Sequence, residues 1–242
     1  MQVTIVIPTY NEAENLPRLI SALFDLPSLN LDVLIVDDNS PDGTGQVSER
    51  LAQENPGRVA VLHRKGKLGL GSAYIQGFRC ALDKGAQAVG QMDADFSHDP
   101  QKLPEMTAAL EHCDVALGSR YIPGGSVDER WPLWRKALSG FGNLYARTIL
   151  GLPVQDVTGG FRIWRRDALQ KMPFENVRSN GYAFQVEMTY LAYLSGCSFQ
   201  EIPIYFADRR WGKSKMSFQI QIEAALRVWQ MRLMYHRIEK RN

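Results

Sequence analysis

The chain has 242 residues, of which 45% are hydrophobic and 22% are charged, and these proportions indicate a globular protein with one sizeable domain. The net charge of +2 is too small to indicate a nucleic-acid partner. Basic residues concentrate in residues 120–166 and 205–241, whereas residues 1–62 are mildly acidic. The second half of the chain therefore favours an anionic ligand or surface.

The three cysteines bear on the compartment. Cys80, Cys113 and Cys197 are odd in number, widely spaced and set among apolar or small neighbours, which favours buried thiols over disulfides or a zinc site. Reduced thiols predict a cytoplasmic protein. We expect no secretory leader, because a strand pattern begins at Val3. We also expect no membrane span, because no segment holds the ~20 uncharged apolar residues that cross a bilayer.

Short apolar runs, typical of strands buried on both faces, alternate with helical patterns in residues 1–119. Strands separated by helices of this length indicate βαβ units. The sequence therefore predicts an α/β fold with a mostly parallel central sheet flanked by helices. The expected strands are residues 3–8, 31–36, 59–62, 86–92 and 115–117, and the expected helices are residues 13–24, 45–54, 72–84 and a further one from Pro100.

The pattern changes after Arg120, where loops and longer helices dominate. A helix rich in aromatic and basic residues is expected over residues 132–150, and a second over 182–195. A strand over 199–206 and a polar loop over 207–216 lead into a long amphipathic helix over about 217–239.

The run Met92-Asp93-Ala94-Asp95-Phe96-Ser97-His98 closes one predicted strand. Side chains two apart in an extended strand point the same way, so the two carboxylates repel each other unless a cation or a shared proton compensates their charge. Mg²⁺ or Mn²⁺ fits, because hard divalent ions bind carboxylate and phosphate oxygens. The run predicts a site for a metal-bound phosphate ester, and a solvated loop is the alternative.

Each loop that follows an early strand carries a distinctive residue set. Carboxylates suit the hydroxyls and amines of a nucleoside, and glycines let the backbone approach a ligand closely. Turn chemistry alone explains any one loop, but four on one edge of a parallel sheet favour a ligand site. The sets are Pro8, Tyr10, Asn11 and Glu12; Asp37 and Asp38; Lys65, Gly69 and Gly71; and Asp93, Asp95 and Ser97.

These loops resemble those of family 2 glycosyltransferases of GT-A fold. The resemblance is carried by Pro8-Thr9-Tyr10-Asn11-Glu12, Val36-Asp37-Asp38-Asn39-Ser40-Pro41-Asp42-Gly43-Thr44, Lys67-Leu68-Gly69-Leu70-Gly71 and Met92-Asp93-Ala94-Asp95. Later motifs are similar to those of dolichyl-phosphate (polyprenyl-phosphate) mannose synthases: Gly118-Ser119-Arg120-Tyr121, Trp131-Pro132-Leu133-Trp134-Arg135, Thr158-Gly159-Gly160-Phe161-Arg162, Gly181-Tyr182-Ala183-Phe184-Gln185-Val186-Glu187, and Asp208-Arg209 through Ser214-Lys215-Met216. The similarity runs from about residue 3 to residue 216.

The resemblance implies a metal-dependent enzyme with a Rossmann-like GT-A sheet. It implies transfer of mannose from GDP-mannose to a polyprenyl or dolichyl monophosphate, with inversion at the sugar. The catalytic domain would be residues 1–216, with a nucleotide-sugar half over about 1–119 and an acceptor half over about 120–216. The helix of residues 217–242 would belong to the same domain or contact a membrane or a partner.

The resemblance also assigns residues. Serine at position 97 stands where some relatives have a glutamine, so Ser97 is expected to reach the metal only through water. The implied donor-nucleotide residues are Pro8, Tyr10, Glu12, Asp38, Lys67 and Asp93, and the implied metal residues are Asp93, Asp95 and Ser97. Arg120, Arg135 and Ser139 match acceptor-phosphate positions, and Arg209 and Lys215 match a mobile loop over the donor diphosphate. Asp95, Arg120, Arg135 and Arg209 are the expected catalytic set.

The chemistry agrees with these residue types. A phosphate monoester has its second pKa near ~6, so at neutral pH it is already a charged nucleophile that needs cations more than a base. Arg135 and Ser139 share one helix face at a spacing of four residues. No base is assigned, and Glu187 is the one carboxylate to test. The candidate cations are Arg120, Arg130, Arg135 and Arg147, and a solvated basic face is the alternative.

A lipid acceptor requires contact with a membrane. Trp131 and Trp134 flank the predicted acceptor cations, and aromatic residues beside cations suit a membrane interface, although core packing explains them equally well. The terminal helix would lie in the interface, bind an anchoring subunit or pack on its own domain. We therefore expect peripheral attachment to the cytosolic face of a membrane. The expected apolar side of this helix holds Phe218, Ile222, Leu226, Trp229, Leu233 and either Tyr235 or His236.

Two other functions remain open from the sequence. One is a polyprenyl-phosphate glucosyltransferase that uses UDP-glucose, because the loops do not identify the base securely. The other is an inactive module that binds a nucleotide sugar. A Rossmann dehydrogenase is disfavoured, because no Gly-x-Gly-x-x-Gly follows the first strand.

Overall fold

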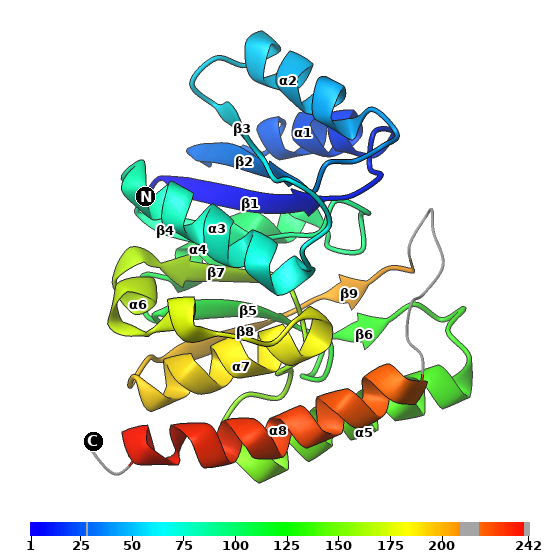
Figure 1. Cartoon of the computed structure of the whole chain (residues 1–242), viewed down its shortest axis with the longest axis vertical. Coiled ribbons are helices and arrows are strands. Elements are labelled where there is room, and N and C mark those ends of the chain that lie inside the picture. Colours follow the sequence, from blue (N-terminus) through cyan, green and yellow to red (C-terminus); the bar gives the residue numbers. More distant parts are fainter. Residues whose placement is uncertain (28, 209–217, 240–242) are drawn as a thin grey trace.

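The computed structural model describes residues 1–27, 29–208 and 218–239. Its centre is a seven-stranded sheet in the order β3-β2-β1-β4-β7-β5-β8, with helices on both faces (Figure 1). The strands are β1 (Val3–Thr9), β2 (Leu31–Asp37), β3 (Val59–His63), β4 (Ala88–Gln91), β5 (Val115–Ser119), β7 (Arg162–Arg165) and β8 (Phe199–Pro203). A small parallel pair joins β6 (Ser126–Val127) to β9 (Tyr205–Phe206).

The helices cover the sheet through two apolar cores. In β1, alternate side chains point to opposite faces, so Val6 enters one core while Ile5 and Ile7 enter the other. The first core lies under α3 (Leu70–Asp83), α5 (Leu133–Leu150), α7 (Gly181–Leu194) and α8 (Phe218–Glu239). The second lies under α1 (Leu16–Phe24) and α4 (Leu103–Ala109). The remaining helices are α2 (Thr44–Glu54), α6 (Arg166–Lys171) and the 3₁₀ turns η1 (Pro100–Lys102) and η2 (Phe174–Asn176).

The strand order creates the place where the site lies. β2 pairs with β1 on one side and β4 pairs with β1 on the other, all in parallel. The chain therefore leaves β1 in one direction and returns on its opposite side, which makes the gap between the carboxyl ends of β1 and β4 a topological switch point. The predicted α/β class and mostly parallel sheet are confirmed.

The structure differs from the sequence expectation at several elements. β4 ends at Gln91 instead of Met92, and the expected strand over 199–206 divides into β8 and β9. β7 was not predicted, and it runs antiparallel between β4 and β5. Only two apolar residues, Ile163 and Trp164, stand between its arginines, so no apolar run marks it in the sequence.

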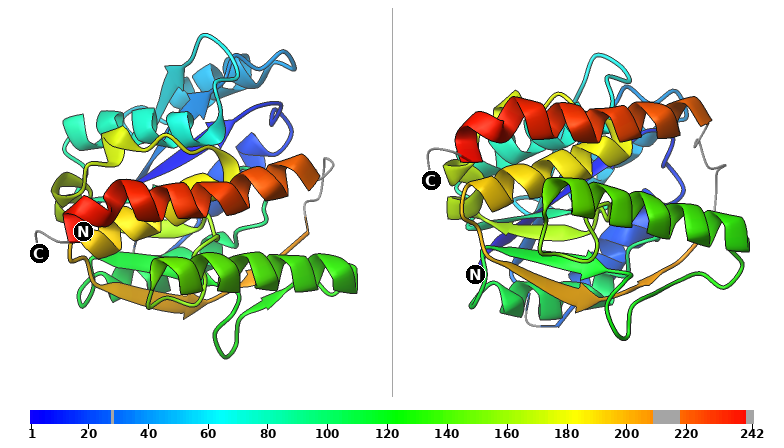
Figure 2. Two further views of the ribbon diagram at one scale, coloured as in Figure 1. Left: turned by 60° about the horizontal axis from the view of Figure 1, so that its bottom comes forward. Right: turned by 90° about the horizontal axis from the view of Figure 1, so that it is seen from below.

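The terminal helix α8 lies beside α5 and α7 (Figure 2). Among its described side chains, Val228, Met231 and Tyr235 are buried. Leu226, Trp229 and Leu233, from the apolar side that the sequence suggests, are exposed instead, whereas the side chains of Phe218, Ile222 and His236 lie outside the described residues. Among the described residues, no helix combines the length and apolar character needed to cross a membrane.

Candidate active site

The loops after β1, β2 and β3 come together at one end of the sheet. Thr9 and Asp37 are partners in the β1–β2 register, and the backbone N–H of Asp38 donates to the Thr9 carbonyl at 3.1 Å. The Lys67 ammonium lies 3.8 Å from the centre of the Tyr10 ring. These contacts bring together loops that are about 60 residues apart in the sequence, as the parallel sheet predicts.

Glu12 and Pro8 complete this side. Pro8 lies within β1 beside Val36 of β2. The backbone N–H of Glu12 donates to the Thr44 hydroxyl at 2.9 Å, and its carboxylate accepts from the Asn15 amide at 2.8 Å. The turn after β1 is therefore fixed against the start of α2.

Asp38 has a partner that the sequence reading missed. Arg64, which follows β3, donates from Nη1 to Asp38 Oδ1 at 2.5 Å and from Nη2 to the Ser72 hydroxyl at 2.5 Å. Burial raises the pKa of the Asp38 carboxyl above its ordinary value, although the Arg64 charge opposes that rise. Arg64 thus ties the β2 loop to the glycine-rich start of α3. Its signal in the sequence is a cation directly after a strand, at the position where the other loops carry ligand-type residues.

The paired carboxylates lie in a tight turn after β4. The Tyr74 phenol donates to Asp93 Oδ1 at 3.2 Å, and Asp95 Oδ1 accepts from the Ser97 hydroxyl at 2.6 Å and its backbone N–H at 3.1 Å. Burial raises the pKa of the Tyr74 phenol, and the negative charges of Asp93 and Asp95 raise it further. The two carboxylates therefore act on one buried phenol. Because β4 ends at Gln91, the two carboxylates belong to the turn, and the alternation of side chains along a strand does not explain their placement.

These two carboxylates fit a divalent ion that takes its remaining ligands from a substrate and from water. Within the described ranges, no three His, Cys, Asp or Glu side chains group closely enough to enclose a metal by themselves. Mg²⁺ and Mn²⁺ bind proteins through one or two carboxylates, while substrate phosphates and water supply the remaining oxygens. Asp93 and Asp95 meet that requirement, and Ser97 orients the Asp95 carboxylate.

Three residues with left-handed backbone conformation mark the same edge. Asn11, Asn39 and Phe96 have φ of 63°, 57° and 60°, and they are the non-glycine residues with positive φ in the described part of the chain. They lie in the loops after β1, β2 and β4 respectively. Such conformations cost of order 1–3 kcal/mol each and concentrate where a backbone is shaped for binding.

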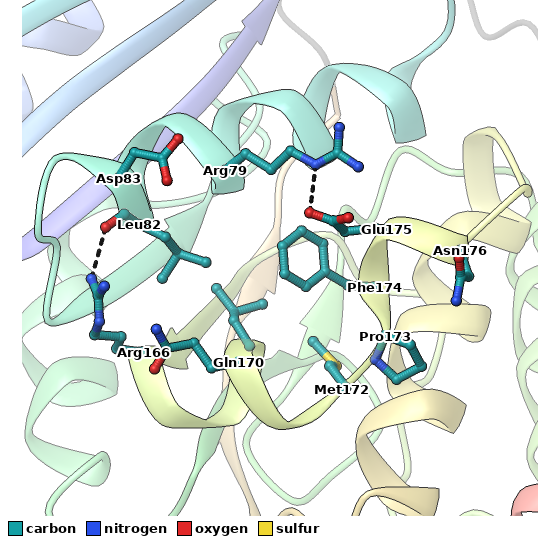
Figure 3. Close-up of a pocket in the computed structure, with 11 residues that line it drawn as sticks. Arg79, Leu82, Asp83, Arg166, Gln170, Met172, Pro173, Phe174, Glu175 and Asn176 are labelled. Carbon is teal, nitrogen blue, oxygen red and sulfur yellow. Dashed lines mark hydrogen bonds and ion pairs between the residues drawn. The ribbon is translucent and has the colours of Figure 1, made fainter.

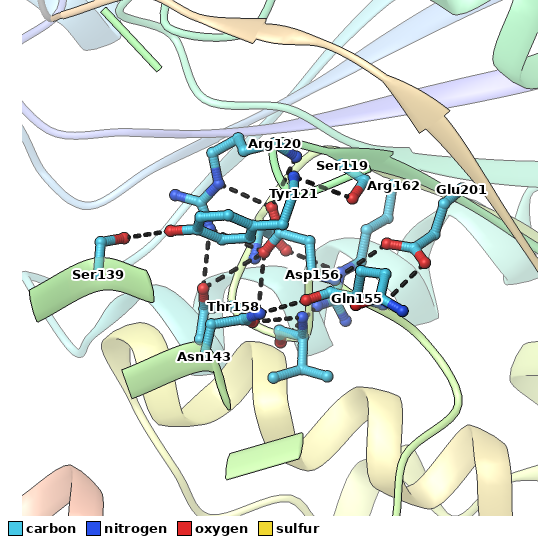
Figure 4. Close-up of polar contacts among 12 residues, drawn as sticks. Ser119, Arg120, Tyr121, Ser139, Asn143, Gln155, Asp156, Thr158, Arg162 and Glu201 are labelled. Carbon is cyan, nitrogen blue, oxygen red and sulfur yellow. Dashed lines mark hydrogen bonds and ion pairs between the residues drawn. The ribbon is translucent and has the colours of Figure 1, made fainter. Parts of the chain in front are cut away.

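On the other side of the acidic turn, Arg120 is held in a buried ion pair (Figure 4). Its Nε donates to Asp156 Oδ2 at 2.7 Å and its Nη2 to Asp156 Oδ1 at 2.8 Å, with a further bond from Nη2 to the Thr158 hydroxyl at 2.8 Å. Burial alone would raise the pKa of Asp156, but the charge and hydrogen bonds of Arg120, together with the charge of Arg162, outweigh burial and hold that pKa below its ordinary value. Arg120 is thus largely neutralised, which the prediction of an acceptor cation did not foresee.

The loop that carries Asp156 is itself fixed by polar side chains (Figure 4). The Glu201 carboxylate accepts from the backbone N–H groups of Gln155 and Asp156 at 2.7 and 2.9 Å. The buried Arg162 guanidinium donates to the carbonyls of Val157 and Gly159 at 3.0 and 2.9 Å. The segment of residues 155–159 is therefore held in place beside Arg120.

Arg135 and Ser139 both lie on α5, as the spacing predicts, but their partners differ. The Arg135 guanidinium stacks 3.7 Å from the Trp131 ring and donates to Asp208 Oδ1 at 3.2 Å. The Ser139 hydroxyl lies 2.7 Å from the Tyr121 hydroxyl. The predicted acceptor residues thus stand along one side of the site, each with a protein partner.

Phe206 in β9 connects the two sides. Its ring packs edge-on against His98 of the acidic run at 5.7 Å and against Trp131 at 5.8 Å. The Arg120 guanidinium lies 5.3 Å from the centre of the same ring. The acidic turn and the basic, aromatic side are therefore parts of one surface.

The remaining predicted cations and the candidate base are either paired within the protein or lie outside the described residues. Arg130 pairs with Asp128 at 2.6 Å, and Arg147 is hydrogen-bonded to Gln155. Arg209 and Lys215 lie outside the described residues. Both carboxylate oxygens of Glu187 accept hydrogen bonds within the protein, from the Ser179 N–H and the Tyr235 hydroxyl, which argues against a role as a base.

A surface depression of about 470 Å³ lies elsewhere, between α3, α6 and η2 (Figure 3). Its charged groups have partners, because Arg79 pairs with Glu175 at 2.8 Å and Arg166 donates to the Leu82 carbonyl at 2.8 Å. It lies at the end of α3 that is remote from the glycine-rich loop, so it is not part of this site.

Comparison with known proteins places the chain among glycosyltransferases. Residues 4–172 match the family described as Glycosyl transferase family 2. An undecaprenyl-phosphate mannosyltransferase of Micrococcus luteus is 46% identical over 228 residues, which cover 94% of this chain and 93% of that protein. A polyprenol monophosphomannose synthase of Mycolicibacterium smegmatis is 44% identical over 226 residues, which cover 93% of this chain and 84% of that protein.

Solved structures agree on the fold. Glucosyl-3-phosphoglycerate synthase from Mycobacterium tuberculosis, in complex with Mn²⁺, UDP and glucosyl-3-phosphoglycerate, has a TM-score of 0.63 at 16% identity, covering 96% of this chain and 79% of that one. A mannosyltransferase from Pyrobaculum calidifontis, in complex with GDP-Man and Mn²⁺, has a TM-score of 0.63 at 15% identity. The match covers 96% of this chain and 64% of that one.

The sheet and the loops at its switch point define a glycosyltransferase of GT-A fold. The chain belongs to glycosyl transferase family 2, as the sequence motifs predict.

Proposed function

We propose that the chain transfers mannose from GDP-mannose to a polyprenyl monophosphate and so forms polyprenyl-phosphate mannose. The observation that carries the proposal is the acidic turn of Asp93 and Asp95, flanked by a nucleoside-type loop set on one side and a basic, aromatic surface on the other. Two relatives at 46% and 44% identity are named for mannosyl transfer to such lipids. A more distant mannosyltransferase of the same fold binds GDP-Man.

A divalent ion, Mg²⁺ or Mn²⁺, would be held by Asp93 and Asp95. When bound, it would neutralise charge on the donor diphosphate as the sugar leaves. Solved neighbours of the same fold are complexed with Mn²⁺, which supports a divalent ion without choosing between the two. Tyr74 and Ser97 would keep the two carboxylates in place for this task.

The acceptor phosphate needs no base of its own. Its second pKa lies near ~6, so it is a dianion at neutral pH and requires only orientation toward the sugar carbon. Arg135 and Ser139 on α5 would contact the acceptor phosphate. Arg120 would hold the neighbouring segment in place through its bonds to Asp156 and Thr158. Arg209 and Lys215, which lie outside the described residues, would contact the donor diphosphate, as the resemblance implies.

Peripheral contact with a membrane follows from the lipid acceptor. The helices α5 and α8 carry large exposed apolar side chains: Leu133, Trp134, Phe141 and Leu144 on α5, and Leu226, Trp229, Leu233 and Met234 on α8. Residues of the same helices, Lys136, Arg147 and Arg227, add positive charge suited to anionic headgroups. This surface would face the cytosolic leaflet or an anchoring subunit.

The proposal is tested by transfer of labelled sugar from GDP-mannose to an organic-extractable polyprenyl phosphate. We expect label in the organic phase with Mg²⁺ or Mn²⁺, and none after chelation. Label from UDP-glucose but not from GDP-mannose would identify UDP-glucose as the donor instead. Tight GDP binding without transfer from any nucleotide sugar would favour a binding module.

A further inference from the structure

Glu187 lies buried on α7 between the terminal helix and a loop at the donor end of the sheet. The Tyr235 hydroxyl of α8 donates to Glu187 Oε1 at 2.6 Å. The backbone N–H of Ser179 donates to Glu187 Oε2 at 3.0 Å. One carboxylate thus connects α8 to the loop that precedes α7, and the side chain is only 1% exposed.

The loop of residues 179–180 packs closely against the glycine segment of residues 69–71. A Cβ atom on Gly71 would lie 2.5 Å from the Ser179 carbonyl oxygen, and one on Gly69 would lie 2.7 Å from Asn180 Oδ1. Gly69 also has a φ of +99°, which only glycine adopts readily. Residues 179–180 therefore approach the glycine segment so closely that no side chain fits between them.

The same stretch of α7 supports the acidic turn. The Phe184 ring stacks on the Tyr74 ring at a centroid distance of 5.8 Å, and Tyr74 donates to Asp93. The glycine segment is also hydrogen-bonded to Arg64, whose guanidinium pairs with Asp38. Residues that α7 holds in place thus reach both the nucleoside-type loops and the carboxylate turn.

We propose that Glu187 is a positioning residue for the donor site, which fixes residues 179–180 against the glycine segment only while Tyr235 of α8 is docked. The inference rests on the proposed function, because the glycine segment belongs to the loop set that would surround the nucleotide sugar. A carboxylate that accepts two bonds in a buried place cannot lose one donor without a cost, because the remaining charge is poorly compensated. Displacement of α8 would therefore loosen the donor loops, although α8 lies on the acceptor side.

The test compares two tyrosines that hold α8. Tyr235→Phe removes the bond to Glu187 and keeps the ring that packs on Tyr190. Tyr145→Phe makes the same chemical change on α5, where the Tyr145 hydroxyl donates to the Ala225 carbonyl and accepts from the Trp229 indole. We expect Tyr235→Phe to raise the KM for the nucleotide sugar about tenfold, the loss typical of one charge-assisted hydrogen bond, with the acceptor KM unchanged. Tyr145→Phe should leave the donor KM unchanged.

Hydrogen exchange gives a second readout that needs no turnover. In Tyr235→Phe, amides of residues 66–72 and 177–181 should exchange faster than in the wild type, and in Tyr145→Phe they should not. Glu187→Gln, which keeps one acceptor oxygen, should show an intermediate effect on both readouts.

Equal donor KM and equal exchange in folded Tyr235→Phe and wild type would overturn the inference. Equal effects of both tyrosine variants would also overturn it, because they would indicate general loosening of α8. If the wild type transfers no sugar, the proposed function fails, and the exchange comparison still decides whether Glu187 positions the glycine segment.

Discussion

The proposed donor and acceptor halves of the site differ in the side chains that their charged groups contact. On the donor side, Asp93 accepts a hydrogen bond from the Tyr74 hydroxyl and Asp95 accepts one from the Ser97 hydroxyl, and both of these donors are uncharged. On the acceptor side, Arg120 and Arg135 face the carboxylates of Asp156 and Asp208. A surface of neutralised cations orients an anion by shape and hydrogen bonds more than by net charge, whereas two neighbouring carboxylates suit a divalent cation.

The largest expected effect comes from breaking the donor side. Asp95→Asn keeps the size of the side chain and removes the charge that a divalent ion needs, so we expect transfer to fall by about 10³-fold, or roughly 4 kcal/mol in the barrier. The measurement is the initial rate at saturating Mn²⁺. Asp99→Asn is the control, because Asp99 follows the acidic run directly and caps η1, so this variant should keep nearly full activity.

On the acceptor side, the largest effect should be on stability. Asp156→Asn leaves the buried Arg120 without its counter-charge, and breaking such a pair costs about 3–5 kcal/mol in the free energy of unfolding. Urea unfolding measures this cost. Glu175→Gln breaks an exposed pair with Arg79 and should cost under ~1 kcal/mol. Similar costs for both variants would mean that the Arg120–Asp156 pair is not structurally special.

The same pair predicts a direction in pH. The pKa of Asp156 is lower in the folded protein than its ordinary value of ~3.9. A lowered folded pKa gives stability that is complete above the unfolded pKa and is lost as the pH falls through the folded pKa. The stability gap between the wild type and Asp156→Asn should therefore be constant near neutral pH and shrink below about pH 4. A gap that does not change down to about pH 2 would contradict this assignment.

The smallest effect concerns the exposed apolar surface of α5 and α8. Leu233 is 75% exposed. Full burial of such a side chain in a bilayer interface contributes about 1.5–3 kcal/mol to the free energy of membrane binding. Leu233→Ser should lower binding to anionic vesicles about three- to tenfold in a flotation assay. Gln230→Ser changes an exposed polar residue of the same helix and should have no effect. Equal flotation of both variants would remove Leu233 from the membrane contact.

The two halves also differ in how far the sequence predicts them. The donor loops could be predicted because each follows an apolar strand, and a parallel sheet brings such ends together without further information. Arg64 was missed although it occupies the same type of position. Its partner Asp38 is 26 residues away, and no local pattern indicates that bond.

The acceptor side depends on contacts that are still more distant in the sequence. Asp156 is 36 residues from Arg120, and Asp208 is 73 from Arg135. Neither pairing follows from periodicity, so the sequence indicated cations where the structure holds ion pairs. In the same way, the amphipathic pattern of α8 identified apolar residues but not the face that packs, because Val228, Met231 and Tyr235 are selected by the surfaces of α5 and α7.

The central claim is that one sheet edge carries separate donor and acceptor halves. Steady-state transfer with both substrates varied, in Asp38→Asn and Arg135→Ala, tests it most directly. The account predicts that Asp38→Asn raises the KM for GDP-mannose alone. It also predicts that Arg135→Ala raises the KM for polyprenyl phosphate alone, by roughly tenfold or more for one lost charge-assisted bond. Arg79→Ala, which removes an arginine from an exposed ion pair outside the site, serves as the control. Equal changes in both constants for either variant would contradict the division of the site.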